Sequence, residues 1–204
     1  MTLEFGDVVF VKGLVTGWRE WRKWMVSWCI RFMSRSKGEA PTFANHVAMV
    51  IGRQGDDYQL AEALGKRGFV YTHLRERYSD TRRFEVCIAR HRRLNADHRA
   101  RMWKRCEHLR GKKYGQAKIV AHAVDFALTA LWNASGGSGD VYAFRWLCRM
   151  ENYPICSWAV ADIYWHAGLP FKKAVAVAQP DDIYDECKAS QLWVWVVDAM
   201  EDVT

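Results

Sequence analysis

The chain has 204 residues, of which half are hydrophobic and 26% are charged, so it can form one domain with a buried core and is neither disordered nor collagen-like. No apolar run reaches the ~20 residues that a membrane-spanning helix needs. The N-terminus has no basic segment followed by an apolar stretch, which a secretory signal would require. We therefore expect a single domain over residues 1–204 and a cytoplasmic location at synthesis.

The formal charge of +7 is unevenly distributed. Residues 75–113 hold 14 Lys or Arg against 5 Asp or Glu, whereas the remainder holds 16 against 18. A solvated basic surface explains this stretch. The alternative is contact with an anionic membrane or cell-wall polymer. No nucleic-acid-binding motif is present, so we expect no nucleic-acid partner.

Six cysteines are scattered singly along the chain, which favours reduced thiols over a disulfide framework. A zinc site would have to use ligands without a recognised spacing, drawn from Cys87, His91, His98, Cys106 and His108. We therefore expect no metal and no other cofactor.

The first half of the chain is dominated by expected strands. Their residues either alternate between apolar and polar or form continuous apolar runs, and turn residues separate them. They cover residues 6–11, 46–51, 58–63, 69–71 and 84–90. One helix is expected over about 17–35, within a Trp-rich insertion at about 14–40. Its indoles Trp18, Trp21 and Trp28 share a face, which favours packing or a groove wall, with membrane docking as the alternative.

The second half is expected to be mainly helical. Three helices are predicted: one from the cap residue Asn95 to Arg110, one over 117–132, and one that begins at Cys156 and ends at Gly168. A last strand is expected over 192–197. Strands and helices are grouped rather than strictly alternating. This order favours an α+β fold with a mostly antiparallel sheet.

Cys156 begins a predicted helix, where unpaired backbone N–H groups and the positive end of the helix dipole favour a thiolate. Helical spacing puts it on the apolar face that should meet the sheet. A nucleophile of this kind also needs oxyanion donors. The backbone N–H of Cys156 is the natural first donor, and the Tyr153 hydroxyl or another side chain is a second.

A thiol nucleophile needs a base, and the base needs an orienting group. His46 begins a strand, and the strand over 58–63 folds back beside it and carries Glu62. Cross-strand neighbours have Cβ atoms ~5 Å apart, so Glu62 can hold the His46 imidazole. In this hypothesis His46 draws the proton from Cys156. Taken singly, His46 and Glu62 are better explained by ordinary structural roles: a strand-edge histidine bonded to backbone and a solvent-facing charge on a half-buried strand.

Three patches together resemble a known family: residues 45–52, then residues 61–63, then Tyr153-Pro154-Ile155-Cys156-Ser157-Trp158. They resemble the NlpC superfamily of papain-like cysteine hydrolases, and the order His, Glu, Cys resembles its circularly permuted, YiiX/YaeF-like branch. The opening residues 6–10 and the stretch from Arg75 to Tyr78 also fit. The segment 14–40, the stretch 116–150 and Trp158 depart from the pattern and put the substrate class in doubt.

The resemblance implies a papain-like fold with the nucleophile at a helix N-terminus. It also implies Cys156 as nucleophile, His46 as base and Glu62 as orienting residue. The expected activity is a cysteine peptidase or amidase acting through a thioester on an amide or ester, such as cell-wall peptide. The alternatives are a lipid acyltransferase or thioesterase at a membrane surface, and a binding or assembly module that retains the fold without catalysis.

Overall fold

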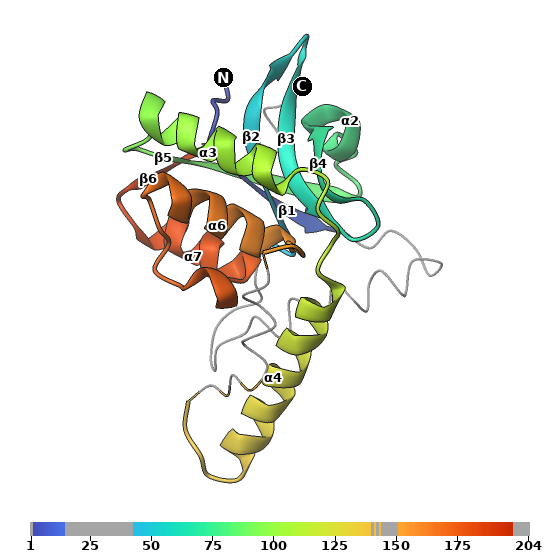
Figure 1. Cartoon of the computed structure of the whole chain (residues 1–204), viewed down its shortest axis with the longest axis vertical. Helices are drawn as coiled ribbons and strands as arrows, with labels where there is room; N and C mark the ends of the chain where they lie inside the picture. Colours follow the sequence, from blue (N-terminus) through green and yellow to red (C-terminus); the bar gives the residue numbers. More distant parts are fainter. Residues whose placement is uncertain (1, 15–42, 140, 142, 144–150, 198–204) are drawn as a thin grey trace.

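The computed structural model describes residues 2–14, 43–139, 141, 143 and 151–197. It has a mixed α+β architecture built on one six-stranded sheet (Figure 1). The strands are β1 (Val8–Gly13), β2 (His46–Gln54), β3 (Asp57–Leu64), β4 (Gly68–His73), β5 (Phe84–His91) and β6 (Trp193–Val197). The helices are α2 (Leu74–Tyr78), α3 (Ala96–Leu109), α4 (Gln116–Ala134), α6 (Cys156–Ala167), the 3-10 turn η2 (Val175–Val177) and α7 (Pro180–Ala189).

The strands are ordered β4-β3-β2-β1-β5-β6, and every neighbouring pair is antiparallel. Successive side chains enter different cores, because a strand alternates its side chains between two faces. Val8 and Phe10 join the cluster that contains α6, whereas Val9 and Val11 join the cluster that contains Tyr78 of α2. The sheet therefore has a buried core on each face, and the expected antiparallel α+β fold is confirmed.

Helix α6 packs on β2 and β3 through the face predicted from its sequence. Ala159, Val160, Ile163 and Ala167 are at most 1% exposed. The helix ends at Gly168, whose φ of +84° lies in the left-handed region that favours glycine. The apolar stripe of α6 thus fixes Cys156 where the helix begins against the sheet.

Several elements differ from the sequence-based expectation. The turn between β2 and β3 is shorter than expected, because the polar Arg53 and Gln54 still pair across the strands. The elements α2 and η2 were not predicted, since five and three residues are too few to show a helical period. Helix α7 was missed although it has ten residues, with Pro180 at its first position and Asp181 and Asp182 in its first turn, which are helix-start signals. The helix expected over about 17–35 lies wholly outside the described residues, and of the Trp-rich insertion at about 14–40 only Leu14 is described.

Helix α4 projects away from the layers formed by the sheet, α3 and α6 (Figure 1). Its side chains Val120, Leu131 and Trp132 are each more than half exposed. Within the part of the chain that the structure describes, no helix is both long and apolar enough to span a bilayer. Four buried cysteines are free thiols, as expected: Cys87, Cys106, Cys156 and Cys187.

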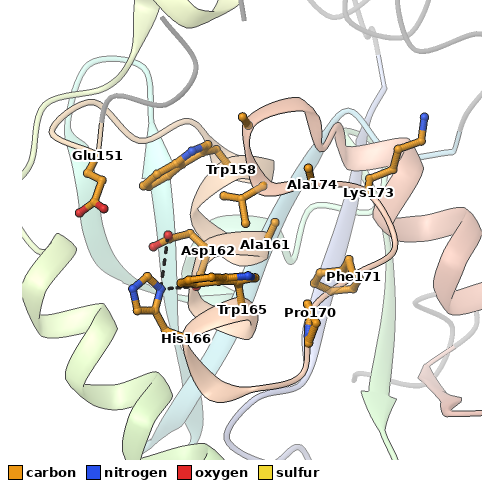
Figure 2. Close-up of a pocket in the computed structure, with 12 residues that line it drawn as sticks. Glu151, Trp158, Ala161, Asp162, Trp165, His166, Pro170, Phe171, Lys173 and Ala174 are labelled. Carbon is orange, nitrogen blue, oxygen red and sulfur yellow. Dashed lines mark hydrogen bonds and ion pairs between the residues drawn. The ribbon is translucent and has the colours of Figure 1, made fainter. Parts of the chain in front are cut away.

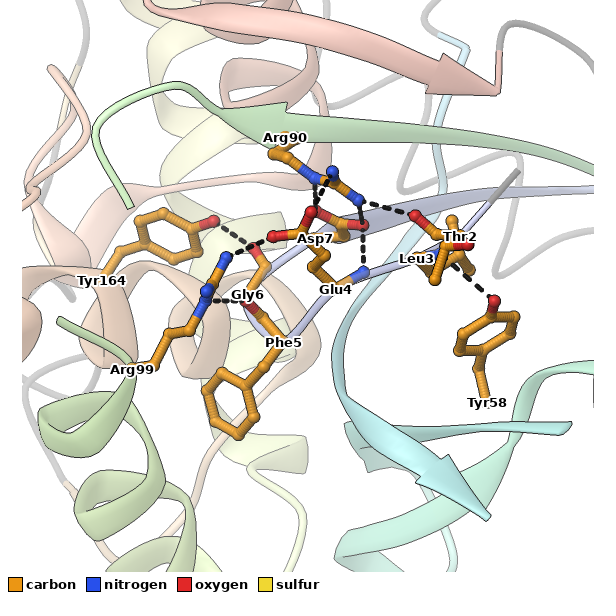
Figure 3. A network of polar contacts seen from close by, with 10 residues as sticks. All are labelled: Thr2, Leu3, Glu4, Phe5, Gly6, Asp7, Tyr58, Arg90, Arg99 and Tyr164. Carbon is orange, nitrogen blue, oxygen red and sulfur yellow. Dashed lines mark hydrogen bonds and ion pairs between the residues drawn. The ribbon is translucent and has the colours of Figure 1, made fainter. Parts of the chain in front are cut away.

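The turn that leads into β1 is held by a network of charged side chains (Figure 3). Asp7 is fully buried, and its two carboxylate oxygens accept hydrogen bonds from Arg90 Nε at 2.7 Å and Nη2 at 2.8 Å. Arg90 also binds Glu4, which in turn contacts Arg99 of α3. The network therefore ties the N-terminal segment to β5 and α3.

We expect Arg90→Met to lower the free energy of unfolding by about 3 kcal/mol, because it leaves the Asp7 carboxylate buried without its charged partner. Urea denaturation measures this change. The matched control is Arg53→Met, since Arg53 pairs with the solvent-exposed Asp56 and its loss should leave stability almost unchanged. Equal effects of the two substitutions would contradict this account of the network.

Candidate active site

Cys156 lies where the N-terminus of α6 meets the beginning of β2. The helix has no side-chain cap at Ile155, so its first backbone N–H groups remain available to a neighbouring anion. The Cys156 sulfur accepts hydrogen bonds from the backbone N–H groups of Val47 and Ser157. These bonds fix a sulfur atom that is almost completely buried.

His46, the first residue of β2, connects Cys156 with Glu62. Its Nε2 lies 2.7 Å from Glu62 Oε2, and its ring is also hydrogen-bonded to the Cys156 side chain. Because Nε2 faces the carboxylate, Nδ1 is the nitrogen left for the sulfur. The His46 side chain is 18% exposed, so solvent reaches the site at the imidazole. The structure thus brings together the three side chains singled out from the sequence.

The register between β2 and β3 refines how these residues meet. Met49 pairs with Ala61, which puts Glu62 opposite Ala48 rather than opposite His46. Glu62 and His46 are therefore diagonal neighbours on the same face of the sheet. Diagonal Cβ atoms are ~7–8 Å apart, a gap that a glutamate and an imidazole can span, whereas a shorter carboxylate side chain would reach less far.

Glu62 is held from several sides besides His46. Its Oε1 accepts a hydrogen bond from Thr72 Oγ1 at 2.5 Å and lies 3.1 Å from Arg77 Nε. Its Oε2 accepts a hydrogen bond from the Tyr78 hydroxyl at 2.7 Å. Arg77 and Tyr78 belong to α2, the one-and-a-half-turn helix that follows β4. The carboxylate is therefore buried, charged and fixed in orientation.

The three groups shift one another's pKa values in a consistent direction. Burial disfavours the imidazolium, but the hydrogen bonds and charges of Cys156 and Glu62 outweigh it and raise the pKa of His46 to about 10. Burial likewise disfavours the carboxylate, yet the hydrogen bond and charge of His46 lower the pKa of Glu62 to about 2. The Glu62 carboxylate therefore stays ionised across the physiological range.

Cys156 differs from two other buried cysteines in its electrostatics. Burial disfavours its thiolate, but the hydrogen bond and charge of His46 and the two backbone donors lower the pKa of Cys156. For Cys106 and Cys187, burial raises the pKa, and nearby acidic side chains raise it further. The site thus favours an ion pair between thiolate and imidazolium at Cys156, whereas Cys106 and Cys187 stay protonated.

Tyr114 is a site residue that the sequence reasoning missed. Burial raises the pKa of its hydroxyl, and the nearby negative charge of Cys156 raises it further, so the hydroxyl stays protonated and can donate. Tyr153, considered from the sequence as an oxyanion donor, is 42% exposed. No local sequence pattern singles out Tyr114; the neighbouring Gly115 lets the chain pass close to Tyr153, because a Cβ there would lie only 2.3 Å from the Tyr153 carbonyl oxygen.

Comparison with known proteins supports the fold. No family model matches the chain, and no curated protein matches it. The crystal structure of the metalloprotein yiiX from Escherichia coli O157:H7 is similar, with a TM-score of 0.55 over 95% of this chain and 96% of that chain. The two sequences are 14% identical, so this likeness shows a YiiX-like fold alone.

The description of yiiX as a metalloprotein raises the question whether side chains here fit a metal ion. Among the residues that the structure describes, no group of three or more His, Cys, Asp or Glu side chains is arranged to hold one. His46 Nε2 faces Glu62, and both Glu62 oxygens already accept hydrogen bonds from protein groups. These side chains are thus arranged as a hydrogen-bonded chain and do not fit a metal site.

We expect Glu62→Gln to raise the pH midpoint of Cys156 alkylation by about one unit or more, because the imidazolium loses its negative neighbour and the thiolate loses support. The measurement is the iodoacetamide reaction rate of Cys156 from pH 5 to 10, with circular dichroism to confirm folding. Glu76→Gln is the matched control, since Glu76 is an exposed acid on α2. An unchanged midpoint in Glu62→Gln would contradict the role given to Glu62.

Proposed function

We propose that the protein is a cysteine hydrolase of the papain-like, circularly permuted NlpC type, which cleaves an amide or ester through a thioester intermediate. The observation that carries this proposal is the chain of contacts from Glu62 through His46 to Cys156 at the start of α6. The chain order of these residues, with the histidine strand before the cysteine helix, supports the permuted arrangement. The YiiX-like fold is consistent with it.

In the first step, the Cys156 thiolate attacks the substrate carbonyl carbon and a carbon–sulfur bond forms. The carbonyl oxygen becomes an oxyanion, for which the backbone N–H of Cys156 and the Tyr114 hydroxyl are the proposed donors. When the tetrahedral species collapses, the carbon–nitrogen or carbon–oxygen bond breaks. The leaving amine or alcohol takes its proton from the His46 imidazolium.

In the second step, water replaces the leaving group. His46, now neutral, accepts a proton from the water as it attacks the thioester carbonyl. The carbon–sulfur bond then breaks, the acid product leaves and the Cys156 thiolate is restored beside the His46 imidazolium. Glu62 remains ionised throughout and holds the imidazole in one orientation. The proposed substrates are peptides or other amides, including cell-wall peptides.

We expect p-nitrophenyl acetate to acetylate Cys156 and then to be turned over. Intact-protein mass spectrometry detects the acyl-enzyme, and released nitrophenolate reports the rate. Tyr114→Phe should slow acylation by about 100-fold, because it removes one oxyanion donor. Tyr153→Phe is the matched control, since that hydroxyl lies on an exposed side chain.

Cys156→Ser should give neither acyl-enzyme nor turnover. If wild-type protein is acetylated no faster than this variant, the hydrolase proposal fails and the binding-module alternative gains support. If Tyr114→Phe and Tyr153→Phe slow acylation equally, Tyr114 is not the second oxyanion donor.

A second candidate function is acyl transfer at a membrane surface, in which a lipid nucleophile replaces water. Two observations favour it. The projecting helix α4 exposes Val120, Leu131 and Trp132. The exposed Lys113 precedes the first turn of α4. A partly apolar exposed helix that follows a cation suits an anionic lipid surface.

We expect the protein to sediment with vesicles of phosphatidylcholine and phosphatidylserine, and to do so less as salt increases. Leu131→Glu should reduce the bound fraction at least about tenfold, because it removes an apolar side chain that would enter the interface. The matched control is Leu192→Glu, at an exposed leucine beside β6. Exclusion from vesicles at every salt concentration would remove this candidate and leave the hydrolase proposal standing.

A further inference from the structure

Exposed cations lie at the end of the sheet that holds the candidate active site. Glu62 of β3 contacts His46, and β3 ends two residues later at Leu64. Lys66 and Arg67 follow in the turn that joins β3 to β4, and both are exposed. The turn therefore continues directly from the strand end that carries Glu62.

A third exposed cation lies between this turn and the start of α6. The Phe69 N–H binds the Lys112 carbonyl oxygen at 2.9 Å, which holds β4 against the segment that follows α3. Lys113 comes next and is exposed. The Gly115 N–H then binds the Pro154 carbonyl oxygen at 3.0 Å, just ahead of α6. The three exposed cations are named the basic rim: Lys66, Arg67 and Lys113.

The chain segments that meet at the site contain one acidic residue, Glu62, against six Lys or Arg. These segments are residues 43–50, 60–70, 110–118 and 152–160. Glu62 is paired with His46 and Arg77, and on α3 Glu107 lies 3.8 Å from Arg110. Among the described residues, no carboxylate forms an ion pair with the basic rim.

Two further acids belong to a separate pocket on the outer side of α6. Figure 2 shows Glu151 and Asp162 among the residues that line it. Arg105 pairs with both carboxylates, at 3.1 and 2.5 Å. The charge of Lys112 also acts on both of them. Two cations thus match these two acids, and the positive charge of the basic rim remains.

The opposite flank of the site has a different charge. Phe43, just before β2, has Lys12 of β1 over its ring and stacks on Tyr184 of α7, with ring centroids 5.1 Å apart. Helix α7 holds four acidic residues against one lysine, although Lys173 pairs with one of them, Asp182. A negative group is therefore favoured on the flank of the β3–β4 turn rather than beside α7.

We propose that the hydrolase acts on a negatively charged substrate, in which a carboxylate is attached near the scissile amide or ester bond. The basic rim attracts this carboxylate to the β3–β4 flank while the scissile carbonyl lies at Cys156. Charges at the surface act over about 10 Å at 0.1 M salt, so the attraction needs no fixed contact. This inference rests on the proposed function and specifies the charge of its substrate.

The first test compares two p-nitrophenyl esters that differ in the charge at the far end of the acyl chain. They are mono-p-nitrophenyl adipate, which is negative, and p-nitrophenyl 6-(trimethylammonio)hexanoate, which is positive. We expect kcat/KM for the negative ester to be about tenfold higher at low salt, and the ratio to approach one at about 1 M salt. A ratio of one or below at low salt would overturn the inference.

Matched variants separate the basic rim from the overall charge of the protein. Lys66→Gln together with Arg67→Gln should lower the ratio about fivefold, because it removes two charges beside the site. The control is Arg92→Gln together with Arg93→Gln, which removes the same charge just after β5, at the opposite end of the sheet. Equal effects of the two pairs would contradict a local role of the rim.

Alkylation of Cys156 gives a readout that needs no turnover. The rate with iodoacetate, divided by the rate with iodoacetamide, should fall in the rim variant and stay unchanged in the control. If neither ester is hydrolysed, the hydrolase proposal fails, and the alkylation ratio still decides whether the rim attracts anions to the site. A ratio that the rim substitutions leave unchanged would overturn the inference even in an active enzyme.

Discussion

The structure of the site depends on one buried carboxylate. Glu62 is almost inaccessible to solvent, and an isolated charge in such a position would be strongly disfavoured. Hydrogen bonds from Thr72 and Tyr78 and the charges of Arg77 and His46 stabilise it as an anion. A fixed anion beside the imidazole then favours the imidazolium, and the imidazolium favours the thiolate of Cys156.

The fold supplies these contacts from both faces of the sheet. Glu62 lies on the face covered by α2, so Arg77 and Tyr78 reach it from a helix of five residues. Cys156 reaches the beginning of β2 from the opposite face, where the apolar side of α6 is packed. His46 stands at the end of the strand, which is where groups from the two faces can meet. The beginning of β2, an inner strand of the sheet, is thus the junction of the site.

Much of this arrangement could be predicted from local sequence patterns. The β2–β3 hairpin and the start of α6 were predictable from apolar periodicity and turn residues, and these elements carry His46, Glu62 and Cys156. Arg77 and Tyr78 as partners of Glu62 were not predictable, because their positions depend on how a very short helix folds back across β3. Tyr114 was missed for the same reason, since its approach to Cys156 depends on packing between distant segments.

The central claim is that Cys156 is an activated thiolate held by His46. The most direct measurement is competitive alkylation at pH 6.5 with a limiting amount of iodoacetamide, followed by peptide mass spectrometry of all six cysteines. The account predicts that Cys156 reacts far faster than Cys106 and Cys187, and that His46→Ala abolishes this difference. Comparable rates at all thiols in the wild-type protein, or a preference that survives His46→Ala, would contradict it.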